Sequence, residues 1–180
     1  MSVQKFSLKD KHNWKSKPGH SICVLDRGAV RFDYPSRWVV KVESGSVMLH
    51  DRESSQESCD LGVSLFPISA SELEGLSLDE VLKSASANND GETLEESPIH
   101  HVDRPGVKIA WFQRRYIEAT QHRHARFRVA FAQGINVHCL ITLNYWENRR
   151  AGVEVVWNEV LRTLHMDEQI QDPTVGPVVQ

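Results

Sequence analysis

The fold of this chain is decided by one stretch, Gly28-Ala29-Val30-Arg31-Phe32-Asp33-Tyr34-Pro35-Ser36-Arg37-Trp38-Val39-Val40. Apolar side chains occupy every second position from Val30 to Tyr34, which is the period of a half-buried β-strand. Pro35 has no backbone N–H to donate and ends that strand, and the same alternation restarts at Trp38. The pattern predicts two strands joined by a corner, with a large indole packed beside it.

The rest of the chain continues as strands with a short and a long helix. Two capping boxes, Ser71-x-x-Glu74 and Ser77-x-x-Glu80, predict the start of a short helix, because each serine–glutamate pair satisfies amide groups there. A long amphipathic helix is predicted over residues 151–166, where apolar residues recur at helical spacing. Strands are predicted at residues 22–25, 30–34, 38–43, 47–51, 61–66, 107–117, 126–131 and 137–145.

Three motifs in this order carry a family resemblance: the strand–Pro–x–x–Trp–strand corner, the strand and helix around Phe66-Pro67, and the terminal helix. Over about residues 20–166 the chain resembles the PsbP-like superfamily, which includes the DcrB and Ran-binding Mog proteins. The resemblance implies an α+β fold, an α/β/α sandwich whose central, mostly antiparallel sheet has about six to seven strands. It places one short helix in mid-chain and packs a long C-terminal helix on the sheet.

The composition predicts one globular domain, because 40% of the 180 residues are hydrophobic and 25% are charged. We expect residues 1–19 to be a partly ordered basic lead-in, residues 20–166 to be the domain, and residues 167–180 to be a disordered tail. The acidic segment 84–97 is rich in Asn, Asp, Gly, Ser and Glu, so we expect a flexible loop that folding does not require.

The charge and cysteine content narrow the possible partners and compartment. A net charge of −3 does not indicate nucleic acid, and no run approaches 18 apolar residues, so no membrane insertion is expected. Three cysteines without paired spacing predict neither a disulfide framework nor a zinc knuckle. Because the first residues are polar, without an apolar targeting segment, the expected location is the cytoplasm.

Residues 51–103 are mainly acidic and 104–150 mainly basic, and we expect folding to mix these blocks.

The polar cluster that most suggests chemistry is His122-x-His124-x-Arg126-x-Arg128. Residues two apart share one face of a strand, so these imidazoles and guanidiniums are expected to line up. Imidazoles can hold zinc, but no carboxylate or cysteine sits at ligand spacing, so no metal is predicted. A basic surface for an acidic peptide or anion is favoured over a metal site, because arginine forks match carboxylate geometry. An unspecialised solvated face is the alternative.

Two further residues join this predicted partner-binding set. Arg114 lies on a neighbouring predicted strand, and Trp146 follows the last predicted strand, close to the basic pair Arg149-Arg150. An exposed indole beside basic residues is typical of protein-docking surfaces, although packing at the edge of the core is also compatible with the sequence.

The sequence contains no motif for an enzyme or a cofactor. Cys23 and Cys139 lie in apolar runs and are expected in the core, whereas the acidic surroundings of Cys59 are expected to raise the pKa of its thiol. The chain has no Gly-x-Ser-x-Gly elbow, P-loop or dinucleotide-binding glycine pattern. We therefore predict no catalytic residues and no cofactor.

These observations favour a non-catalytic protein-binding domain. The PsbP-like resemblance implies an adaptor or chaperone-like role, in which the partner presents an acidic surface or a hydrophobic helix. Two alternatives stay open: a small-ligand-binding domain with a pocket between sheet and terminal helix, and a metal-dependent enzyme or sensor that uses the face of His122 and His124.

Overall fold

The computed structural model describes residues 3–43, 46–51, 59–66, 77–86 and 91–178. Within these ranges an eight-stranded sheet has the order β3-β4-β5-β10-β9-β8-β6, with β7 also paired to β8, and a three-stranded sheet has the order β1-β2-β11. The strand pairs are antiparallel. The strands are β1 His20–Leu25, β2 Val30–Pro35, β3 Val39–Glu43, β4 Ser46–His50, β5 Asp60–Phe66, β6 Gly91–Glu96, β7 His100–Arg104, β8 Val107–Glu118, β9 His124–Gln133, β10 His138–Trp146 and β11 His165–Met166.

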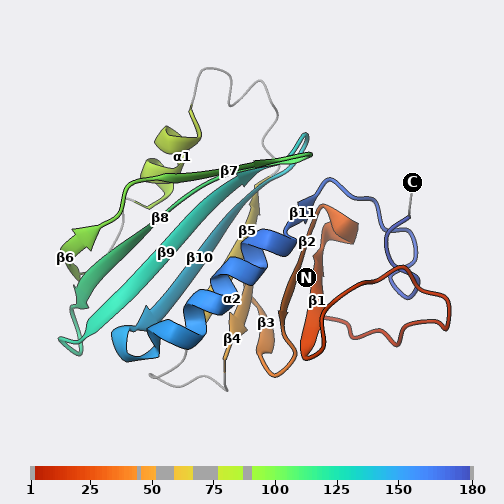
Figure 1. Ribbon diagram of the computed structural model, residues 1–180, viewed down its shortest axis with the longest axis horizontal. Coiled ribbons are helices and arrows are strands. Elements are labelled where there is room, and N and C mark those ends of the chain that lie inside the picture. The colour runs from red at the N-terminus through yellow and green to blue at the C-terminus, as the bar shows by residue number, and fades with distance from the viewer. Residues whose placement is uncertain (1–2, 44–45, 52–58, 67–76, 87–90, 179–180) are drawn as a thin grey trace.

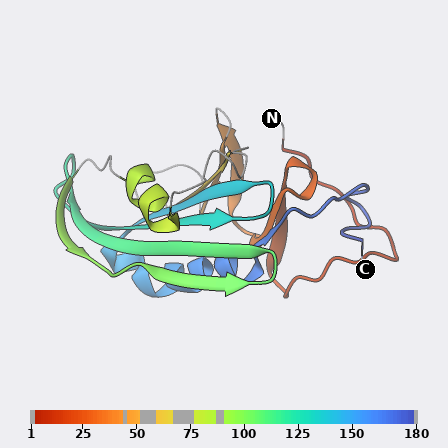
Figure 2. The same ribbon diagram turned by 90° about the horizontal axis from the view of Figure 1, so that it is seen from above.

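Two α-helices lie on opposite faces of the large sheet (Figures 1 and 2). Helix α1, Leu78–Ala85, covers part of one face, and helix α2, Arg150–Thr163, crosses the other. A short 3-10 turn, η1 Asp26–Gly28, follows β1, and another, η2 Glu147–Arg149, precedes α2. This arrangement confirms the predicted α+β class and the three-layer α/β/α sandwich.

The predicted corner connects the two sheets. Strand β2 ends at Pro35, whose carbonyl accepts a hydrogen bond from the Trp38 amide at 2.9 Å, and β3 begins at Val39 in the other sheet. The Trp38 side chain is only 6% exposed and belongs to the main hydrophobic core, as the sequence predicts. The corner therefore sends the chain from one sheet into the next and buries an indole at the junction.

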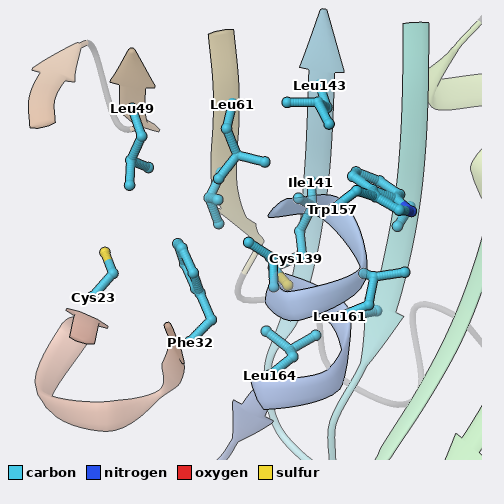
Figure 3. Packing of buried hydrophobic residues seen from close by; sticks show 14 of the residues in the cluster. Cys23, Phe32, Leu49, Leu61, Cys139, Ile141, Leu143, Trp157, Leu161 and Leu164 are labelled. Carbon is cyan, nitrogen blue, oxygen red and sulfur yellow. The ribbon is translucent and has the colours of Figure 1, made fainter. Parts of the chain in front are cut away.

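The main core lies between α2 and the large sheet. Trp157 and Leu161 of α2 face Cys139 and Ile141 of β10, and Phe32 of the small sheet packs into the same cluster (Figure 3). Trp157 is completely buried. Each fully buried large apolar side chain contributes roughly 1.5–3 kcal/mol by leaving water, so this layer is the main source of stability.

The predicted second capping box is present at the start of α1. The Glu80 amide donates to the Ser77 hydroxyl at 3.3 Å, and the Glu80 carboxylate accepts from the Ser77 amide at 2.8 Å. Leu82 then packs in a smaller cluster with Phe112 and Phe131 on the opposite face of the sheet from α2. The other predicted box, at residues 71–74, lies outside the described residues.

The prediction that residues 84–97 form a flexible loop is wrong at both of its ends. Helix α1 continues to Ala85, and Gly91–Glu96 form β6, which pairs with the end of β8 through a bulge between Thr93 and Glu95. An edge strand has one neighbour and no face that must be apolar, so its polar composition resembles that of a loop. Residues 87–90 lie outside the described residues.

The predicted disordered tail is also corrected by the structure. Residues 165–177 turn back from α2 and run beside the lead-in, where the amides of Lys9 and Asn13 donate to Thr174 and Val175. The Trp14 indole N–H donates to the Pro173 carbonyl at 3.0 Å, and its ring covers Gly176, whose position has no room for a Cβ. The prolines that indicated disorder therefore belong to a segment held by the lead-in.

Candidate functional site

The predicted polar cluster lies at the end of the large sheet where β8 turns into β9. The Glu118 carboxylate accepts hydrogen bonds from the amides of Thr120 at 3.0 Å and Gln121 at 2.6 Å. These amides, that of Gln121 first, hold the pKa of Glu118 below its usual value. The Glu118 amide also donates to the Arg123 carbonyl at 2.9 Å, so the turn is fastened at several points.

The four residues of the His-Arg motif do not form one row. Strand β9 begins at His124, and His122 stands in the turn with a left-handed φ of 52°. Both imidazoles are exposed. Alternation along β9 places His124 on the same face as Arg126 and Arg128, but the turn removes His122 from that row.

Arg126 and Arg128 are buried, which corrects the expectation of an open basic face. Arg126 is 7% exposed and binds Glu147 through two hydrogen bonds of 2.5 and 3.1 Å. Arg128 is 5% exposed and donates to Glu154 of α2 at 2.7 Å and to Gln113 at 2.9 Å. Both guanidiniums therefore have carboxylate partners inside the molecule. They link β9 to η2 and to α2.

Arg114 and Trp146 lie on the other face of the sheet. Cross-strand register pairs Arg114 with Phe127, and it aligns Tyr116, Ala125 and Trp146 across β8, β9 and β10. Arg114 donates to Glu96 of β6 at 2.9 Å. The six predicted site residues are thus divided between two faces, with Arg114 and Trp146 brought together and Arg126 and Arg128 kept apart from them.

Sequence reasoning missed two residues of this face, Tyr116 and Arg123. The Arg123 guanidinium lies 4.3 Å from the centre of the Trp146 ring, a cation–π geometry. Burial raises the pKa of the Tyr116 phenol, and the charge of Glu118 adds to that effect. Register was the missing information, because only cross-strand pairing aligns these residues. We call Arg114, Tyr116, His122, Arg123, His124 and Trp146 the arginine–aromatic end.

Comparison with known proteins identifies the family. The model of the Alr1449 family matches residues 21–170. The chain belongs to the Alr1449 family. It is 30% identical over 170 residues to the uncharacterized protein alr1449 of Nostoc sp. (strain PCC 7120), an alignment that covers 94% of this chain and 88% of the relative.

Solved structures resemble this Alr1449-family domain in fold. Cyanobacterial PsbP (CyanoP) from Synechocystis sp. PCC 6803 has a TM-score of 0.58 and 17% identity, with 84% of this chain and 94% of that chain covered. The Ran-binding protein Mog1p of Saccharomyces cerevisiae has a TM-score of 0.50 and 13% identity, with 82% and 95% covered. These similarities confirm the PsbP-like fold that the corner motif indicated.

The cysteines of the Alr1449-family domain have the environment of structural rather than reactive thiols. Burial raises the pKa of Cys23 and of Cys139 to about 12. Burial also raises the pKa of Cys59, and Asp51 and Asp60 add to it, so the predicted direction is correct but burial is the larger cause. Among the described residues no three His, Cys, Asp or Glu side chains are grouped as metal ligands, and no helix is long and apolar enough to cross a membrane.

Proposed function

We propose that this Alr1449-family protein is a non-catalytic, cytoplasmic protein-binding domain that docks its partner on the arginine–aromatic end. The observation that carries the proposal is the Arg123 guanidinium held 4.3 Å from the Trp146 ring beside a turn fastened by Glu118. Arginine is one of the residue types that most often dominate binding energy at interfaces, and here the largely buried Trp146 ring orients the guanidinium. A side chain already stacked in place loses less conformational entropy when a partner arrives.

The solved structures with the same fold support only the general proposal that this domain binds a protein. Mog1p is named a Ran-binding protein and has the same fold, so a domain of this shape can serve protein binding. A shared fold does not transfer a partner. The adaptor or chaperone-like role is therefore proposed from the surface, and the three buried, unpaired cysteines are compatible with a reducing cytoplasm.

The chemistry of the site favours a partner with an acidic surface over a hydrophobic helix. His122 and His124 flank Arg123 in the sequence and are exposed, so cationic and polar groups surround this turn and favour an acidic surface. A hydrophobic helix would need an exposed apolar groove, but Tyr116 and Trp146 are each only 9% exposed. Because Glu96 already pairs with Arg114, we expect the binding to depend only moderately on salt.

Quantitative affinity capture from the protein's own cells tests the proposal. Three baits are compared: wild type, Arg123→Glu, and Lys108→Glu, which reverses an exposed charge near the start of β8, at the other end of the large sheet. The partner captured by wild type is then purified, and its affinity is measured by titration calorimetry. We expect Arg123→Glu to weaken binding at least about tenfold and Lys108→Glu to leave it unchanged. Equal affinity for the two variants would overturn the proposal.

A further inference from the structure

Two hollows flank His165 at the end of the molecule opposite to the arginine–aromatic end. The first has a volume of about 240 Å³ and is lined by Arg104 and by the apolar Val107, Leu164 and Met166. The second, of about 290 Å³, is lined by Trp14, Lys15, Arg31 and Pro177. His165 lines both hollows. Val107 begins β8 and Tyr116 lies near its end, so the two regions are about 30 Å apart at about 3.4 Å per residue.

Cationic side chains from separate parts of the chain line the two hollows that His165 shares. Arg31 comes from β2, Arg104 from β7 and Lys15 from the lead-in. Glu168 is the acid beside them, and it already accepts two hydrogen bonds from Arg31, of 2.5 and 2.9 Å. The His165 ring lies 3.4 Å from the same carboxylate. The Glu168 carboxylate therefore neutralises only part of the positive charge of these side chains, which leaves an excess of positive charge around His165.

Arg104 is held in place by hydrogen bonds to the end of α2. Its two terminal nitrogens donate to the carbonyls of Leu161 and Leu164, each at 2.9 Å, and to that of Arg162, so the guanidinium caps the end of α2. Its Nε is buried and has no hydrogen-bond partner among the described residues. Arg104 also lines the first hollow, so its positive charge lies beside that space and favours an anionic ligand there.

We propose that the hollows at His165 bind a small organic anion, a carboxylate carried on a compact apolar body. The carboxylate lies between His165, Lys15 and the two arginines. The apolar body lies in the first hollow against Val107, Leu164 and Met166. This site is separate from the arginine–aromatic end and does not depend on the proposed docking function.

Binding of such an anion is coupled to a proton at His165. Burial lowers the pKa of this imidazole, Arg31 and Arg104 lower it further, and Glu168 opposes them. A bound carboxylate favours the imidazolium and raises that pKa, so the protein takes up a proton on binding. Affinity is therefore expected to increase as the pH falls through the range in which His165 titrates.

The test uses benzoate as the probe, with NMR chemical shifts of the backbone amides as the measurement. Benzyl alcohol is the neutral analogue, and acetate lacks the apolar body. We expect benzoate alone to shift residues 104–107 and 164–166 in a saturable way. Loss of a hydrogen bond to a charged group in His165→Ala is expected to weaken binding about tenfold, with a smaller effect for Lys15→Gln. The controls His12→Ala and Lys11→Gln change exposed lead-in residues that line neither hollow.

Three results would overturn the proposal. Benzoate-induced shifts that do not saturate up to the solubility limit of benzoate would contradict the site. Equal shifts from benzyl alcohol would show that charge plays no part. Unchanged affinity in both His165→Ala and Lys15→Gln would place the binding elsewhere.

Discussion

Arg128 of β9 and Glu154 of α2 form an ion pair, with 2.7 Å between Nη2 and Oε1, that joins the large sheet to the C-terminal helix. The guanidinium is shielded on another side by the Trp111 ring, whose centre lies 5.7 Å away. Arg150, one turn before Glu154 on α2, donates to the same carboxylate from the surface. A residue that the sequence assigned to partner binding is thus part of the contact that holds the helix in place.

Removal of Glu154 should destabilise the protein strongly, because it leaves the Arg128 charge buried without its carboxylate. We expect Glu154→Leu to lower the free energy of unfolding by about 3 kcal/mol. The double variant Arg128→Met with Glu154→Leu should recover most of that loss. Urea denaturation measures both, with Arg150→Ala as a control that removes only an exposed partner of Glu154 and should change the free energy of unfolding much less. A double variant no more stable than Glu154→Leu would contradict this account of the pair.

Truncation of the corner tryptophan should be similarly costly. Trp38 is buried in the main core, and Trp38→Ala removes a large side chain that the surrounding residues cannot replace. The expected loss is about 3–5 kcal/mol, measured by urea or thermal denaturation. A variant that melts like wild type would mean that the corner does not organise the fold.

Replacement of β6 should destabilise the sheet edge. We expect a Gly/Ser segment of equal length at residues 91–97 to cost at least about 2 kcal/mol, which lowers the melting temperature by about 4–8 °C. The reasons are the pairing with β8 and the loss of the Glu96–Arg114 ion pair. Leu94→Ser, which changes an exposed side chain of the same strand, should leave stability within about 0.5 kcal/mol. An unchanged melting temperature in the segment variant would restore the flexible-loop interpretation.

Acid stability should depend on Glu159. Hydrogen bonds from Arg162, and then from Lys17, lower its pKa from 4.5 to about 2. A carboxyl with a lowered pKa stabilises the fold above pH 4.5, and this contribution is lost as the pH falls towards 2. Glu159→Gln should therefore reduce the loss of stability over that range by about 1–2 kcal/mol, a value kept small because the Arg162 side chain is 66% exposed. Parallel pH–stability curves for variant and wild type, from urea titrations, would contradict the assignment.

The corner, the order of the elements and the core could be predicted because each depends on the spacing of apolar residues within a short segment. The alternation from Val30 to Tyr34 and the helical spacing around Trp157 appear in the structure as a strand and a helix on the core. The edge strand β6 and the tail escaped prediction, since neither has an apolar face of its own. Their order comes from distant partners, Arg114 for Glu96 and Trp14 for Pro173.

The candidate site was predicted only in part, for a different reason. Sequence spacing indicates which residues share a face, but it does not reveal which distant carboxylate will neutralise a charge. The basic and acidic blocks mix through pairs such as Arg114–Glu96 and Arg115–Glu95, as expected. The burial of Arg126 by Glu147 follows from where η2 places that glutamate, which no motif in the sequence encodes.

Site-specific photo-crosslinking in the protein's own cells tests the central claim most directly. A photoreactive benzoylphenylalanine replaces His122 in one variant and Lys108 in a matched control, both at exposed positions. The account predicts one crosslinked protein of defined mass from position 122, none of that mass from position 108, and loss of the product when Arg123→Glu is added. The same product from both positions, or a product at position 122 that persists with Arg123→Glu, would contradict docking at the arginine–aromatic end.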